Sequence, residues 1–236
     1  MYYELTNNDI LFLTNYDDDG RYCIYLSKKH PNWIYLLMDF INYHKNNNFI
    51  VEYKVKNEDL ELAEKEYKDF CYDGALREYE SKILVHSTSL QNWNTITQSM
   101  KLKSWNKAVM EGNIDEIHPI GDLLNDPISF RDFVMLGEMT WQNEIVVLSK
   151  QLGKLTYDKD QAYTPGVRIY IDAKKLAQDG LLLRDGIHLM VKDYLDLGKY
   201  MIDFVEASKL PITVFTPFTF SEMADDFFKR KHPDFA

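Results

Sequence analysis

Hydrophobic and polar positions follow a mixed helix and strand pattern over the first 80 residues. Aromatic and β-branched side chains over 21–26 predict a strand, and alternation over 49–55 predicts another. Between them, apolar residues three and four positions apart predict a helix over 31–45. A second helix is expected to begin at Asn57, a suitable N-cap that is followed by acidic residues. We therefore expect residues 1–80 to form a small α/β module.

Beyond residue 80 the pattern becomes richer in strands. Apolar or alternating runs predict strands over residues 83–85, 144–149, 166–171, 181–183, 187–191 and 212–220. Helical spacing predicts shorter helices over residues 90–100, 130–136 and 173–178. The turn Arg184-Asp185-Gly186 contains the Asp-Gly pair that is typical of a hairpin. The chain is therefore expected to have an α+β fold, with a second domain over residues 81–236.

Composition agrees with a folded protein. In 236 residues, 45% hydrophobic positions are too many for a disordered chain, and 10 glycines with 7 prolines are too few for a fibrous one. Cys23 and Cys71 are too few for a disulfide scaffold, so both thiols are expected to be reduced. The N-terminus lacks signal-peptide features, and no run approaches the roughly 18 apolar residues of a membrane helix. These features predict a cytoplasmic protein without a membrane segment.

The charge balance narrows the possible partners. Against 27 Lys and Arg there are 37 Asp and Glu, so the net charge is −10 and sequence-independent nucleic-acid binding is disfavoured. A local basic pocket for one nucleotide or strand stays possible. The six histidines are dispersed, so no metal site is expected. The many asparagines and lysines are compatible with an AT-rich bacterial or phage genome.

Three residues at the end of the strand over 83–85 are candidates for ligand binding. His86 follows an apolar run, and strand ends often present side chains to a cleft. Its imidazole could bind a ribose hydroxyl, and the backbone of Ser87 could pair with a carboxamide. Alternatively, His86 is a structural histidine, and Ser87 and Thr88 only cap the helix that follows.

Two more candidates lie in the predicted strand over 144–149, and one lies in the strand over 166–171. Glu144 could be a catalytic acid or an orienting carboxylate, or it could lie in an exposed turn, and Ser149 ends the same predicted strand. Arg168 lies on the opposite face from its two neighbours, so it would bind an anion if that face lines a cleft.

The last two candidates are Arg184, in the predicted hairpin turn, and His188, in the strand that follows. Neither residue belongs to a known short motif. The sequence contains no phosphate-binding glycine loop, no dinucleotide fingerprint, no zinc-protease motif and no nucleophile elbow.

The order of these motifs resembles the ADP-ribosyltransferase superfamily, and most closely its RNA 2′-phosphotransferase branch. The first shared motif is a strand, the triplet His-Ser-Thr at 86–88 and the helix after it. The later motifs are Leu-Ser at 148–149, Ile-Asp-Ala at 171–173, Asp-Gly at 179–180 and the hairpin at 184–189. The resemblance covers about residues 83–205.

The resemblance implies a split antiparallel β-sheet that binds NAD, as a co-substrate, between its two halves. His86 would hold the nicotinamide ribose, the backbone of Ser87 would bind the carboxamide, and Thr88 would support that loop. The reaction would release nicotinamide and transfer ADP-ribose to a macromolecular or nucleotide acceptor, mainly through orientation and electrostatic stabilisation. We expect catalysis from His86, Glu144, Ser149 and Arg184. We expect NAD to be bound by His86, Ser87, Thr88, Ser149, Arg168 and His188.

The sequence also departs from this family. Ser87 stands where the family has a glycine, and the histidine and basic residue of the second strand motif are absent. Two alternatives therefore stay open: a non-catalytic module that binds NAD or a protein on the same fold, or an RNA 2′-phosphotransferase. Residues 1–80 match no family motif.

Overall fold

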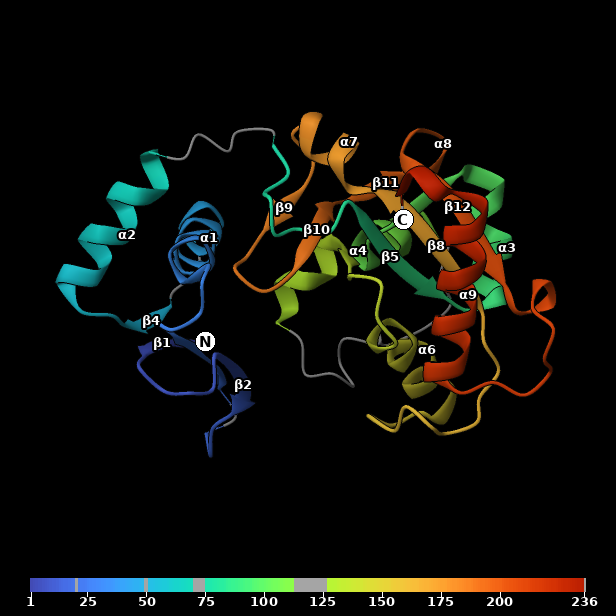
Figure 1. The fold of residues 1–236 in the computed structure, drawn as a ribbon, viewed down its shortest axis with the longest axis horizontal. Coiled ribbons are helices and arrows are strands. Elements are labelled where there is room, and N and C mark those ends of the chain that lie inside the picture. Colours follow the sequence, from blue (N-terminus) through green and yellow to red (C-terminus); the bar gives the residue numbers. More distant parts are fainter. Residues whose placement is uncertain (20, 49–50, 70–74, 113–126, 236) are drawn as a thin grey trace. The chain divides into compact units, whose positions relative to one another are not determined.

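A computed structural model describes residues 1–19, 21–48, 51–69, 75–112 and 127–235 (Figure 1). Contacts divide the chain into two compact units. Unit 1 consists of Met1–Asp73 and Arg184–His188, and unit 2 consists of Gly74–Leu183 and Leu189–Ala236.

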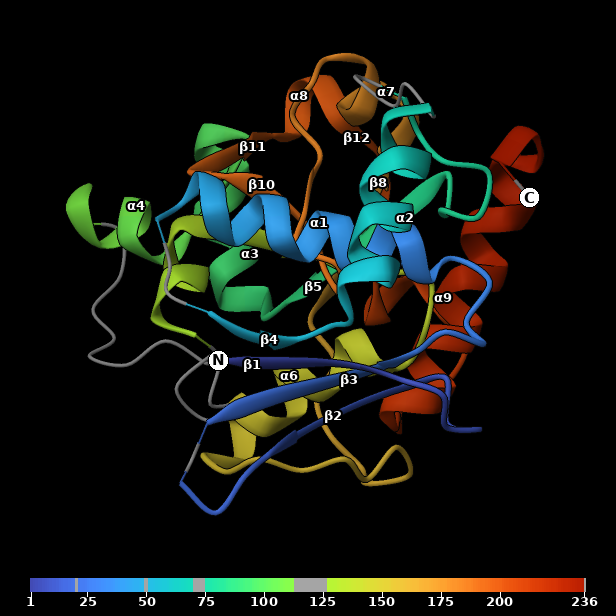
Figure 2. The same cartoon turned by 90° about the vertical axis from the view of Figure 1, so that its left-hand side faces the viewer.

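Unit 1 is a four-stranded sheet with two helices on one face (Figure 2). The strands are β1 (Tyr2–Thr6), β2 (Phe12–Tyr16), β3 (Tyr22–Ser27) and β4 (Glu52–Lys54), in the order β2-β3-β1-β4. The helices are α1 (Trp33–Asn46) and α2 (Asn57–Asp69). Tyr3 and Leu26 from the sheet pack against Leu37 and Phe40 of α1 and Ala63 of α2. Burial of these apolar side chains stabilises the unit.

The segment Arg184–His188 packs with unit 1, which the sequence did not predict. Gly186 has a φ of +87°, and a Cβ built on it would lie 2.3 Å from the Leu36 carbonyl oxygen. Only glycine fits both this conformation and this close approach to α1. Ile187, next to it, packs against the hydrophobic core of unit 1.

The described residues of unit 2 form three small sheets. Strands β5 (Ile83–Thr88), β8 (Val167–Asp172) and β12 (Met201–Glu206) form an antiparallel sheet in the order β12-β8-β5. Strands β7 (Phe133–Leu136), β10 (Leu189–Lys192) and β9 (Leu183–Arg184) form the second, with β9 at the boundary of the two units. Strands β6 (Lys101–Lys103) and β11 (Tyr194–Asp196) form the third.

Helices lie on both faces of the sheet that contains β5. The helices among the described residues of unit 2 are α3 (Leu90–Ser99), α4 (Trp105–Met110), α6 (Gln142–Leu152), α7 (Ala173–Gln178), α8 (Leu197–Tyr200) and α9 (Pro217–Lys231). On one face, Leu84 and Ile171 pack in a core with Trp93 of α3 and Leu176 of α7. On the other face, Val85 and Tyr170 pack in a second core with Phe220 and Phe228 of α9. The expected α+β fold class is confirmed.

Three elements that the sequence predicted as other structures are corrected. Residues 144–149 are not a strand but part of α6, because Ile145, Leu148 and Ser149 recur at helical spacing on its buried face. Most of residues 212–220 is likewise not a strand, since Thr216 caps α9 and the only strand-like contact there is an isolated bridge, Tyr163–Phe215. The predicted helix over 130–136 is a 3₁₀ turn (Ile128–Asp132) followed by β7.

Several predicted elements agree with the structure, and others were missed. The helix over 31–45 corresponds to α1, and the helix over 173–178 corresponds to α7. The predicted strand over 49–55 is the shorter β4, and residues 49 and 50 lie outside the described residues. Cys23 is a buried free thiol, while Cys71 lies outside the described residues. The missed elements include β1, β2, β6, β11, β12, α8 and α9.

Among the described residues, none of the helices combines the length and the apolar character that a bilayer crossing requires. The same residues contain no cluster of three His, Cys, Asp or Glu side chains placed to hold a metal ion.

Candidate functional site

The candidate site is the free edge of β5 in unit 2. On its other side β5 pairs with β8, with His86 opposite Ile169 and Ser87 opposite Arg168. At the free edge, Val85 exchanges two backbone hydrogen bonds with Gly137, at 2.7 and 3.0 Å, in an isolated bridge.

The Val85–Gly137 bridge also determines the direction of the next backbone groups. In a strand, the N–H and C=O of alternate residues point to the same edge. Since Val85 directs both groups toward Gly137, Ser87 directs its own N–H and C=O to the same edge, beyond the bridge. The backbone of Ser87 therefore offers one donor and one acceptor side by side at an edge that β8 does not cover.

His86 has one ring nitrogen engaged and one available. Its Nδ1 lies 3.0 Å from the backbone oxygen of Met135 on β7. A carbonyl only accepts, so Nδ1 carries the proton and Nε2 carries the lone pair. No hydrogen bond engages Nε2 among the described residues. Burial lowers the pKa of His86, and the Met135 carbonyl only partly offsets this effect, so the ring is neutral near pH 7.

On the face of the sheet that packs against α6 and α9, by contrast, buried polar side chains are paired with one another. Arg168 is fully buried there and donates from Nη1 to Glu144 Oε1 at 3.0 Å. Its Nε and Nη2 donate to the two carboxylate oxygens of Asp225, at 2.7 and 3.0 Å. Nη2 also donates to the Thr140 carbonyl at 3.2 Å. Burial alone lowers the pKa of Arg168, but Glu144 and Asp225 more than compensate and raise it.

Hydroxyl groups complete this cluster. The Ser87 hydroxyl donates to Glu144 Oε1, and the Tyr163 hydroxyl donates to Glu144 Oε2 at 2.9 Å. The Tyr170 hydroxyl donates to Asp225 Oδ1 at 2.9 Å. Burial, and next the charge of Glu144, raises the pKa of Tyr163. We call Ser87, Glu144, Tyr163, Arg168, Tyr170 and Asp225 the buried ion cluster.

The buried ion cluster leaves no free carboxylate oxygen. Every oxygen of Glu144 and Asp225 accepts at least one hydrogen bond, and both side chains are at most 7% exposed. A buried charge is stable only when it is paired in this way. The geometry therefore gives Glu144 and Arg168 a structural role and does not present them to a ligand.

The sequence predicted Ser149 at the end of a strand, but the residue lies inside helix α6. Its side chain is fully buried, and its Oγ accepts from the Thr156 backbone N–H at 3.3 Å. The hydroxyl thus holds the loop that follows α6. Thr88 is also buried, and its carbonyl oxygen lies so close to Gly166 that a Cβ there would approach it to 1.8 Å. Thr88 therefore contributes to the packing of β5 against the segment before β8.

Arg184 and His188 belong to unit 1 by their contacts, whereas His86 belongs to unit 2. Asp185 organises this turn, since its Oδ1 accepts from the backbone N–H groups of Ile187 and His188 at 2.9 and 2.6 Å. His188 Nδ1 lies 3.0 Å from Asp185 Oδ2. Burial raises the pKa of Asp185, but His188 and the backbone donors outweigh it and lower the pKa.

Sequence reasoning missed three residues that shape this region: Met135, Gly137 and Asp225. The first two act through backbone groups, which leave no side-chain signal. Asp225 could have been found, because it lies on the apolar face of α9 between Ala224 and Phe228. An acidic residue on a buried helical face requires a partner, and Arg168 is one of few candidates.

No protein-family model matches the chain, and no curated protein or solved structure matches it either.

Proposed function

We propose that unit 2 binds NAD at the free edge of β5 and transfers ADP-ribose from it to a macromolecular or nucleotide acceptor. The observation that carries this proposal is the hydrogen bond between His86 Nδ1 and the Met135 carbonyl. It leaves Nε2 as an acceptor next to the free peptide groups of Ser87.

The donor and acceptor pattern of this edge matches the nicotinamide half of NAD. His86 Nε2 would accept a hydrogen bond from a hydroxyl of the nicotinamide ribose. The N–H and C=O of Ser87 would pair with the oxygen and the amide nitrogen of the carboxamide. In the reaction, the bond between C1′ and the nicotinamide nitrogen breaks with its electrons going to nitrogen. The acceptor's nucleophile bonds to C1′ and releases its proton to solvent.

The Ser87 side chain does not obstruct this arrangement. A side chain on a strand points perpendicular to the sheet, whereas the backbone groups lie in its plane. The hydroxyl of Ser87 points to Glu144 in the buried ion cluster. The side chain of serine in place of glycine therefore fills space on the face of α6 and does not extend along the edge.

The arrangement of the strands also supports a split sheet. Strands β5 and β7 belong to two different antiparallel sheets, and the Val85–Gly137 bridge joins them. Beyond that bridge, the imidazole of His86 reaches the Met135 carbonyl, which would otherwise be available to pair with β5.

A second candidate function is NAD binding without transfer. The burial of Glu144 favours it, because the acidic residue that the sequence offered for catalysis is bound on both oxygens. An RNA 2′-phosphotransferase is less well supported, since Arg168 is already occupied by two carboxylates and is not available to a phosphate.

Isothermal titration with NAD and an assay of nicotinamide release test the proposal on the wild type, His86→Ala and His232→Gln. We expect the wild type to bind NAD and release nicotinamide, and His86→Ala to bind about tenfold more weakly, as expected for one lost hydrogen bond. His232→Gln is the matched control, because His232 bonds Asp203 away from the β5 edge. Binding without nicotinamide release supports the second candidate. A wild-type protein that neither binds nor consumes NAD refutes both.

A further inference from the structure

Strand β2 forms one edge of the sheet in unit 1, and hydrogen bonds at its two ends show which of its backbone groups point away from the sheet. The Leu11 carbonyl accepts from Ser27 N–H at 2.9 Å, and the Asp17 N–H donates to the Arg21 carbonyl at 3.1 Å. The backbone N–H and C=O groups of the odd-numbered residues of β2 therefore point toward β3. By alternation, the N–H and C=O of Phe12, Thr14 and Tyr16 point away from the sheet.

This edge lacks the features that normally protect one. Exposed edge strands usually carry charged residues, proline or a bulge, which prevent pairing with another chain. The sequence of β2, Phe-Leu-Thr-Asn-Tyr, contains none of these residues. Nearby apolar side chains are also exposed: Ile10 by 62%, Leu11 by 42% and Leu13 by 42%.

The opposite edge, β4, is protected in the usual way. It has three residues, two of which, Glu52 and Lys54, are charged and ion-paired with Arg21 and Glu4. The contrast within one sheet indicates that β2 is kept open for pairing.

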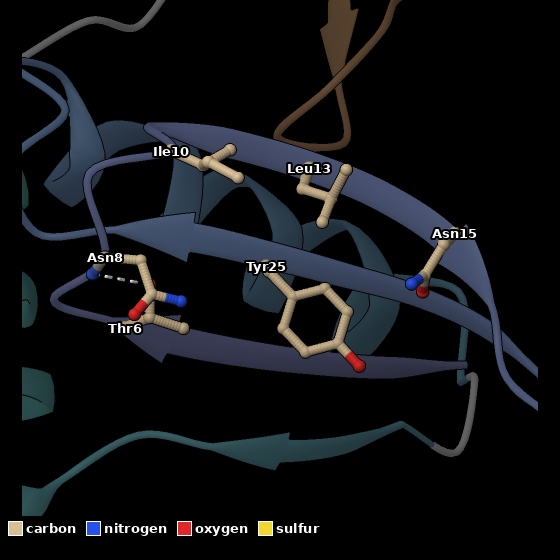
Figure 3. Close-up of a pocket in the computed structure, with 6 residues that line it drawn as sticks. All are labelled: Thr6, Asn8, Ile10, Leu13, Asn15 and Tyr25. Atoms are coloured by element: carbon tan, nitrogen blue, oxygen red, sulfur yellow. Dashed lines mark hydrogen bonds between the residues drawn. The ribbon is translucent and has the colours of Figure 1, made fainter.

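A pocket lies beside β2 on the sheet face that α1 and α2 do not cover (Figure 3). Its volume is about 220 Å³, and it is lined by Thr6, Asn8, Ile10, Leu13, Asn15 and Tyr25. The lining combines the apolar side chains of Ile10 and Leu13 and the Tyr25 ring with the polar side chains of Asn8 and Asn15. In an added strand, every second side chain would lie on this face, where the pocket can receive one of them.

Charges at the two ends of β2 select the partner. Asp9 precedes the strand, and Asp17, Asp18 and Asp19 follow it, while Lys29 and Arg21 pair with Asp9 and Asp17. A second copy paired in the parallel direction would place the acidic Asp17–Asp19 ends against each other, and like charges in such positions disfavour that pairing. In the antiparallel direction this acidic end would meet Asp9, whose charge Lys29 offsets, whereas lysine or arginine of a partner would be attracted to it.

We propose that β2 binds an extended segment of a partner protein, apolar at alternate positions and flanked by lysine or arginine, as an added strand. This inference concerns unit 1 only and is independent of the function proposed for unit 2.

The test uses the full chain and a fluorescent peptide, Lys-Lys-Val-Thr-Val-Thr-Val-Lys-Lys, with binding followed by anisotropy. A peptide with the same core and glutamate flanks is the charge control. We expect the lysine peptide to bind about tenfold more tightly than the glutamate peptide at low salt, and the difference to shrink above about 0.1 M salt. Hydrogen exchange of the Phe12, Thr14 and Tyr16 amides should slow when the lysine peptide is bound.

The variants Thr14→Pro and Thr14→Val locate the interaction. Proline at position 14 removes an N–H that points outward, so it leaves the ladder to β3 intact. We expect Thr14→Pro to weaken peptide binding about tenfold and Thr14→Val, which retains the N–H, to bind like the wild type. Equal binding of the two peptides, or equal binding by the two variants, would overturn the proposal. Sedimentation that shows a dimer disrupted by Thr14→Pro would overturn it in favour of self-pairing.

Discussion

His86 and Ser87 are neighbours on β5, yet their polar groups have opposite surroundings. His86 Nε2 has no hydrogen bond to any described residue, and it lies at the edge toward which the buried residue Ser87 directs its N–H and C=O. The Ser87 side chain instead enters the buried ion cluster, where every carboxylate oxygen is engaged. Residue type alone therefore does not separate a binding group from a structural one. The separation comes from whether each polar group already has a partner.

The largest expected effect comes from breaking the buried ion cluster. Arg168→Leu would leave the carboxylates of Glu144 and Asp225 buried without their cation. Such a loss costs about 3–5 kcal/mol, which urea denaturation measures as a fall in the free energy of unfolding. Arg21→Ala is the control, because its ion pair with Asp17 is exposed and exposed ion pairs contribute little to stability. A loss below about 1 kcal/mol in Arg168→Leu would mean that the cluster has no structural role.

A smaller effect is expected from Ser87→Ala. The substitution removes one hydrogen bond to Glu144, while Arg168 and Tyr163 continue to bind that carboxylate. We expect a loss of about 1–2 kcal/mol in the free energy of unfolding, measured by the same method. A loss as large as that of Arg168→Leu would contradict the view that the arginine holds the cluster together.

The smallest effect concerns pH. Burial lowers the pKa of His86 in the folded chain, so the unfolded chain binds a proton at higher pH than the folded one. The contribution of His86 to stability is therefore fully present above about pH 7, and it falls as the pH drops through the pKa of the unfolded chain, about 6.5. The slope is at most about 1.4 kcal/mol per pH unit for one proton.

His86→Gln removes this contribution, so urea midpoints of the variant should depend less on pH than those of the wild type. His44 in unit 1 also has a pKa lowered mainly by burial, so His44→Gln should flatten the profile in the same direction. An unchanged profile in His86→Gln would show that its imidazole titrates equally in both states.

Local patterns predicted much of the fold. The helix α1 and the strand β8 were recognisable because their apolar residues recur at a clear period, and the strands β3 and β5 because of their aromatic, β-branched or continuous apolar runs. The prediction of a strand over 144–149 was wrong. Ile-Val-Val favours a strand locally, but the segment forms part of helix α6, which is stabilised by burial of one of its faces. Strand β2 was missed because its short run of mixed residues is stabilised by pairing with β3.

The candidate site could be predicted only in part. The sequence predicted His86 at the end of a strand over 83–85, whereas it lies inside β5 (Ile83–Thr88), and its partner Met135 is 49 residues away. The partners of Arg168 are equally remote, at separations of 24 residues for Glu144 and 57 for Asp225. Such pairings arise from the tertiary fold, so the sequence alone did not distinguish the free edge of β5 from the buried ion cluster.

The central claim, that NAD binds through the free peptide edge of β5, is tested most directly by comparing Ser87→Ala with Ser87→Pro in NAD titrations. Both variants lack the hydroxyl, but only proline lacks the outward N–H, and its loss does not break the ladder to β8. We predict that Ser87→Ala binds NAD like the wild type and that Ser87→Pro binds about tenfold more weakly or not at all. Equal NAD affinity in the two variants would contradict the account.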